Sequence, residues 1–195
     1  YQWQSSPDGS GWSNIVSGGN GSTYNVPTAT PGTTYFRLVL TDVSNGCGDP
    51  VSNAVFVTVN PQINVSVSVD NPVVCIGGSS TITSTVTGGS GLVSYQWQSS
   101  PNGTTGWANI NSNGTFPNYD VPTSVAGTTY YRLIVTDFAN GCNDPVSNVV
   151  NVVVNPQASV SIAANNDLVC IGGSAILTST VTNGSGFFNY QWQSS

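Results

Sequence analysis

The stretch Tyr-Gln-Trp-Gln-Ser-Ser occurs three times in this chain, at residues 1–6, 95–100 and 190–195. The first residues of the copies are 94 and 95 positions apart, which indicates tandem repeats, each within the usual size of a small domain. Aromatic and amide side chains alternate along the stretch. This alternation predicts a strand on which Trp97 faces the core and the flanking glutamines face outward.

Outward from this stretch, apolar and polar residues alternate at period two, and clusters of Gly, Asn, Asp and Pro separate the runs. No segment shows helical spacing, so the sequence predicts an all-β chain of two-layered sandwiches. The residues predicted to form the core of the complete repeat include Trp97, Tyr131, Leu133, Val135 and Val152.

The tripeptide Asn-Pro-Gln marks the expected domain boundary, because it recurs at 60–62 and 155–157. It follows a valine-rich strand, and its proline cannot donate a hydrogen bond to a sheet. We therefore expect the C-terminal part of one repeat at 1–60, a complete repeat at 61–156, and the N-terminal part of the next repeat at 157–195. We also expect the chain to be a segment of a longer array.

Charge is scarce in this chain. The charged residues are eight Asp and two Arg, and the net charge is −6. The lack of a basic patch argues against nucleic acid and anionic lipid as partners, and no apolar run approaches the roughly 20 residues that span a bilayer. The Asp residues are scattered at turns rather than paired, and the chain has no His. We therefore predict no enzymatic activity, no bound metal and no cofactor.

The cysteines Cys47, Cys75, Cys142 and Cys170 form two series with a 95-residue period. Two cysteines per repeat without His predict a disulfide framework in an oxidising, extracellular setting. The favoured bridge joins Cys75 to Cys142, which requires the segment near Val74 to lie in parallel beside the start of the last strand. Cys47 and Cys170 are then expected to pair outside this sequence. A bridge from Cys47 to Cys75 across the junction is the alternative.

Three motifs of the complete repeat resemble those of a known family: Val-Cys-Ile-Gly-Gly-Ser at 74–79, Gly-Thr-Thr-Tyr-Tyr-Arg-Leu-Ile-Val-Thr-Asp at 127–137, and Asn-Gly-Cys at 140–142. Together with the stretch at 95–100, they resemble the bacterial Ig-like repeats of giant cell-surface adhesins in Bacteroidota. Those adhesins include gliding adhesins exported by the type IX secretion system. The resemblance implies tandem Ig-like sandwiches in a rod at the cell surface, and it brings no ligand site with it.

Trp12 and Trp107 are weak ligand candidates, because both follow a polar Ser-Ser-Pro segment and aromatic faces can stack on sugars. Packing against a neighbouring strand is the alternative for both. Arg37 and Arg132 are expected either to pair with an Asp or to cover an aromatic ring.

The function that these observations favour is the structural stalk of a repetitive extracellular adhesin or filament, which projects a distal adhesive region in surface attachment or gliding. The expected partners are neighbouring repeats of the same chain, with surface polysaccharide or other cells bound by regions outside this sequence. Two alternatives remain open. The chain is a subunit of a self-assembled extracellular filament, or it is a spacer module of a secreted polysaccharide-degrading enzyme.

Overall fold

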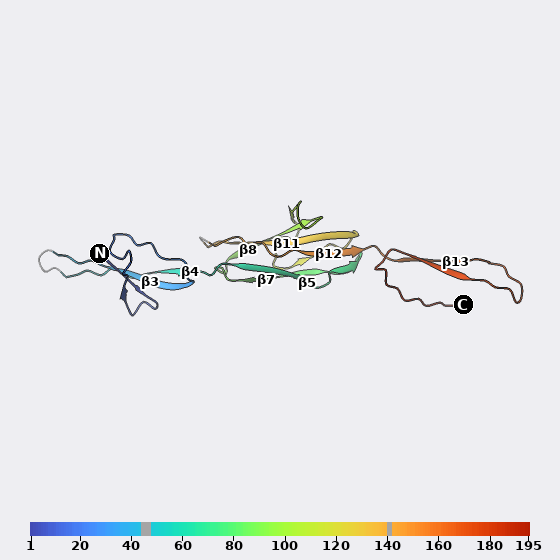
Figure 1. The fold of residues 1–195 in the computed structure, drawn as a ribbon, viewed down its shortest axis with the longest axis horizontal. Coiled ribbons are helices and arrows are strands. Elements are labelled where there is room, and N and C mark those ends of the chain that lie inside the picture. Colours follow the sequence, from blue (N-terminus) through green and yellow to red (C-terminus); the bar gives the residue numbers. More distant parts are fainter. Residues whose placement is uncertain (44–47, 140–141) are drawn as a thin grey trace. The chain divides into compact units, whose positions relative to one another are not determined.

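A computed structural model describes residues 1–43, 48–139 and 142–195 (Figure 1). Its regular elements in these ranges are all β-strands, so the chain is all-β as predicted. No helix in the described ranges is long and apolar enough to cross a membrane. The chain divides into two compact units. The first comprises residues 1–63 with 88–92 and 138–143, and the second comprises 64–87, 93–137 and 144–195.

The first unit contains one antiparallel sheet with the strand order β2-β1-β3-β4. Its strand β1 is the first copy of the repeated stretch, and Trp3 on β1 lies opposite Leu38 on β3. The strands are β1 (Gln2–Ser6), β2 (Ser13–Asn14), β3 (Gly32–Val39) and β4 (Val55–Val59).

The second unit contains a three-stranded sheet, β10-β7-β5, a five-stranded sheet, β6-β12-β11-β8-β9, and a hairpin, β13-β14. The three-stranded sheet comprises β5 (Asn64–Val69), β7 (Thr81–Thr87) and β10 (Tyr119–Asp120). The five-stranded sheet comprises β6 (Val73–Cys75), β8 (Val93–Ser100), β9 (Ala108–Asn109), β11 (Gly127–Asp137) and β12 (Val150–Asn155). The hairpin comprises β13 (Ser159–Ala164) and β14 (Leu177–Thr182).

The two larger sheets of the second unit pack against each other. Strand β5 contacts both β11 and β12, and Figure 1 shows β5 and β7 in one layer with β8, β11 and β12 in the other. The apolar residues that alternate along these strands close the space between the layers. The residues predicted for the core are all buried: Trp97, Tyr131, Leu133, Val135 and Val152.

Trp97 lies at the centre of this core and is 0% exposed. Its indole Nε1 donates a hydrogen bond to the Phe116 carbonyl at 2.8 Å, which satisfies the one polar atom that the ring brings into the interior. Its ring lies 6.0 Å from that of Tyr119, which in turn lies 5.7 Å from that of Tyr131. This aromatic row fills the layer interface where the repeated stretch crosses it.

The copies fold alike where they overlap. Trp97 on β8 lies opposite Leu133 on β11, as Trp3 lies opposite Leu38 in the first unit. The hairpin β13-β14 repeats the register of β5 and β7, because its Ser159–Thr182 pair lies 95 residues after the pair of Asn64 and Thr87.

The short strand β6 pairs in parallel with β12, as the predicted bridge required, but at the other end of that strand. Val74 lies opposite Val154 and Cys75 opposite Asn155, where β12 ends. The chain reaches Cys142 only after β11 has ended at Asp137.

The bridge predicted between Cys75 and Cys142 is therefore wrong. Cys75 lies at the level of the Gly127 end of β11, because Val154 pairs with Gly127. The 11 residues of β11 separate that end from Asp137, a distance of about 33 Å at the usual rise of a strand. A disulfide needs its two Cα atoms within about 7 Å. The Cys75 thiol is unbridged in the structure.

Candidate interaction site

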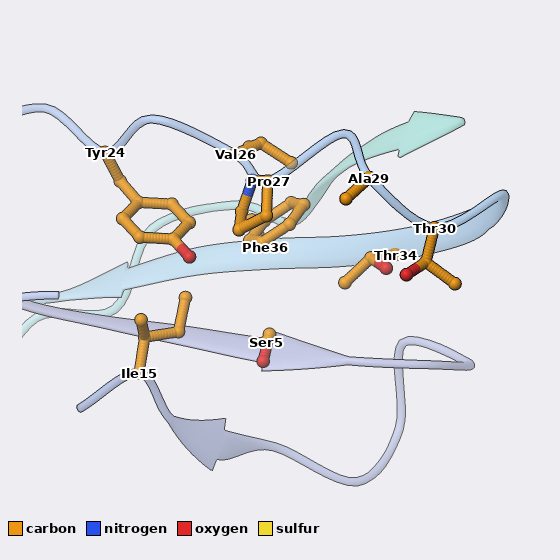
Figure 2. A pocket seen from close by; sticks show the side chains of 9 residues that line it. All are labelled: Ser5, Ile15, Tyr24, Val26, Pro27, Ala29, Thr30, Thr34 and Phe36. Carbon is orange, nitrogen blue, oxygen red and sulfur yellow. The ribbon is translucent and has the colours of Figure 1, made fainter. Parts of the chain in front are cut away.

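A pocket of about 400 Å³ opens on one face of the first sheet (Figure 2). Its floor is the face of β1 and β3, and the segment of residues 24–30 forms one wall. Ile15 and Tyr24 extend into the pocket from opposite sides in Figure 2. The lining is mainly apolar and includes Ile15, Tyr24, Val26 and Phe36, with Ser5 and Thr34 among the polar members.

The equivalent face of the complete repeat is covered by a second sheet. Tyr119 and Val121 are the counterparts of Tyr24 and Val26, 95 residues later. Tyr119 lies opposite Ile82 on β7, the Val121 amide donates to the Ser80 carbonyl at 2.9 Å, and both side chains are buried. Tyr24 is only half-buried. The pocket therefore lies on the face that strands such as β5 and β7 cover in a complete repeat.

The hairpin β13-β14 is a two-stranded layer of the same kind. It has the register of β5 and β7, and its apolar side chains are exposed, with Val160 at 69% and Ile162 at 64%. Val67, the counterpart of Ile162, is 6% exposed in the complete repeat. The pocket face of the first sheet and the apolar face of the hairpin β13-β14 are therefore both uncovered. The counterparts of both faces are buried in the complete repeat.

Gln62 and Gln157 end the two Asn-Pro-Gln segments, which are called linkers from here on. Each of these linker glutamines makes a hydrogen bond to the backbone of a neighbouring repeat. In the second unit, Gln157 Nε2 donates to the Ile76 carbonyl at 2.7 Å. In the first unit, the equivalent Gln62 accepts at its Oε1 from the Asn143 amide at 3.1 Å. The sequence alone predicts no role for either glutamine. The one sequence feature that could have indicated a role is that each glutamine follows Asn-Pro at the same position of the repeat.

Arginine covers one face of each candidate tryptophan. The Arg37 guanidinium lies 4.4 Å from the centre of the Trp12 ring, and that of Arg132 lies 4.2 Å from the Trp107 ring. Arg132 also donates from Nε to Gln98 Oε1 at 2.8 Å, which holds the guanidinium over the ring. The expectation that arginine covers an aromatic ring is confirmed, and one face of each indole is occupied. A sugar contact at either tryptophan stays a prediction.

Asp8 illustrates what the scattered carboxylates do. Its Oδ1 accepts hydrogen bonds from the Ser10 amide at 2.8 Å, the Ser6 hydroxyl at 3.0 Å and the Gly11 amide at 3.3 Å. These donors, the Ser10 amide foremost, hold the pKa of this exposed carboxyl well below its usual range. Asn102 accepts equivalent bonds in the second copy of this turn, which indicates a turn-forming role for both residues.

The described part of the chain contains no group of three or more acidic, His or Cys side chains close enough to hold a metal ion. Of the remaining cysteines, Cys170 is exposed and unbridged, and Cys47 lies outside the described residues. Their predicted pairing beyond this sequence stays a prediction.

A family model described as "Domain of unknown function (DUF8696)" matches the chain over residues 1–61 and 64–156. No curated protein and no solved structure matches the chain. The two matched stretches together cover well over half of the chain, and they are the stretches that contain the repeated strand, the Trp–Arg stack and the valine-rich closing strand. The chain therefore belongs to the DUF8696 family.

Proposed function

We propose that this chain is a load-bearing segment of a repetitive extracellular stalk, in which Ig-like sandwiches follow one another as a rod and hold a distal adhesive region away from the cell surface. The stalk acts in surface attachment or gliding and catalyses no reaction. The tandem match to one family and the domain-scale repeat support this proposal, because domains in such arrays contact mainly their sequence neighbours.

The observation that carries the proposal is the pair of linker hydrogen bonds. Gln62 and Gln157 occupy the same position in successive linkers, yet one binds the domain that follows it and the other the domain that precedes it. One amide group has both a donor and an acceptor, so a glutamine between two complete repeats can make both bonds. Such a linker resists bending, and its proline restricts it further.

The charge-poor surface also suits a structural fibre. With ten charged residues in 195, there is little for salt to screen. The Ser, Thr, Asn and Gly residues at the surface keep the chain hydrated without long-range attraction to charged surfaces. We therefore expect the length and stability of the rod to be insensitive to ionic strength.

The test is the size of arrays that contain two, four and eight complete repeats. Small-angle scattering and negative-stain electron microscopy are expected to show a maximum dimension that rises in proportion to repeat number, at one thickness. Glycine in place of both linker glutamines is expected to widen the distribution of angles between domains without unfolding them. Compact particles, whose size grows only as the cube root of mass, would contradict the stalk.

A further inference from the structure

The turn that follows Cys75 is fixed at the C-terminal end of the complete repeat. The Ile76 amide donates to the Asn155 carbonyl at 2.9 Å, and the Gly77 amide donates to the Thr123 carbonyl at 3.1 Å. Thr123 in turn donates from Oγ1 to the Gly78 carbonyl at 2.6 Å. Three bonds therefore hold the half-buried Cys75 against Asn155 and Thr123, beside the linker.

Cys142 lines a cavity of about 530 Å³ within the first unit, together with Thr28, Asn60 and Gln62. Thr28 and Asn60 precede Thr123 and Asn155 by 95 residues, and they are the counterparts of the two residues that hold the Cys75 turn. The cavity thus lies where a turn like that of Cys75 is bound in a complete repeat. A cysteine of the following repeat, Cys142, forms part of its wall.

The linker glutamines lead independently to the same pairing. Gln157 binds the carbonyl of Ile76, the residue after Cys75, and its counterpart Gln62 binds the amide of Asn143, the residue after Cys142. In a junction between two complete repeats, the two atoms of one amide group would make both bonds. Each cysteine is then one residue from a backbone atom held by that amide, which allows their Cα atoms to approach within the range that a disulfide needs.

We propose that a disulfide joins successive repeats, between Cys75 of one repeat and the cysteine equivalent to Cys142 in the repeat that follows. This inference rests on the consecutive repeats of the proposed function. The bond bypasses the Asn-Pro-Gln linker, so that tension passes from the end of one domain into the next through a covalent strap. It replaces the bridge within one repeat, which the strand register rules out.

The bond forms by thiol–disulfide exchange with a protein or low-molecular-weight disulfide. One thiolate attacks a sulfur of that oxidant and releases its other sulfur as a thiolate. The second cysteine thiolate then attacks the resulting mixed disulfide, which forms the new sulfur–sulfur bond and releases the remaining oxidant thiolate. The two cysteines lose two protons and two electrons, and the oxidant becomes a dithiol or two thiols.

The test lengthens the 195-residue chain with a second copy of residues 101–156. The chain ends in the same six residues as 95–100, so this addition completes the third repeat and supplies the proposed partner of Cys75. The original Cys142 is replaced by serine, so that only the added copy of this cysteine remains. After oxidation with glutathione disulfide at low protein concentration, non-reducing peptide mapping by mass spectrometry is expected to find Cys75 bridged to the added cysteine.

A matched variant keeps the original Cys142 and carries serine at the added cysteine instead. Its Cys75 is expected to stay alkylatable under native conditions, because it is unbridged in the 195-residue chain. A bridge between Cys75 and the original Cys142 in this variant, or a free Cys75 in the first variant with unchanged circular dichroism, would overturn the proposal. Particle length separates this result from the stalk: extended rods with free Cys75 thiols refute the strap alone, and compact particles with the bridge refute the stalk alone.

Discussion

Replacing Trp97 with alanine is expected to lower the free energy of unfolding of the complete repeat by about 3–5 kcal/mol. The side chain is 0% exposed and packs against the Tyr119 ring. Its loss leaves a large cavity between the two sheets and removes the indole donor to the Phe116 carbonyl. Urea unfolding followed by circular dichroism at the β-sheet band measures the change.

Trp107→Ala is the matched control, because it removes the same side chain from a half-buried position. Its expected cost is smaller, since it loses mainly the contact with Arg132. Trp97→Phe is expected to fall between the two, because it keeps most of the apolar volume and loses the hydrogen bond. Equal effects of Trp97→Ala and Trp107→Ala would contradict the position of Trp97 at the centre of the core.

Replacing Gly114 with alanine is expected to destabilise the same repeat by about 1–3 kcal/mol through steric conflict. A Cβ on Gly114 would lie 1.9 Å from the Ile110 carbonyl oxygen, so the backbone must move. The turn between these two residues is bonded to Trp97 on both sides. The Trp97 amide donates to the Gly114 carbonyl at 2.7 Å, and the Ile110 amide donates to the Trp97 carbonyl at 2.9 Å.

Gly11→Ala is the control for this substitution, since a Cβ there meets nothing within 4 Å. Gly19→Ala tests whether the copies are equivalent, because its Cβ would lie 2.0 Å from the Ile15 carbonyl oxygen in the first unit. Thermal unfolding of the three variants gives the ranking. A Gly114→Ala melting temperature within a degree of that of Gly11→Ala would show that this turn is not tightly packed.

The linker and the cysteines show where prediction from the sequence ended. Recurrence at 95 residues was enough to align Gln62 with Gln157 and Cys47 with Cys142, since identical residues at a fixed period occupy the same place in each copy. It was not enough to say what those residues touch. Hydrogen-bond partners such as Ile76 and Asn143 come from other strands, and their approach depends on how the strands are paired.

The alternation of apolar and polar residues in the sequence is sufficient to predict the core. A period of two places every second side chain of a strand on one face, so alternation identified Trp97, Tyr131, Leu133, Val135 and Val152 as buried before any contact was known.

The register between segments far apart in the chain depends on tertiary contacts. Parallel pairing of β6 with β12 was expected, but alternation is the same at either end of a strand, so it could not place Val74 opposite Val154. That register separates Cys75 from Cys142 by the length of β11. It also brings Cys75 beside the Asn-Pro-Gln segment at 155–157, because Gln157 donates a hydrogen bond to the carbonyl of Ile76, the residue after Cys75.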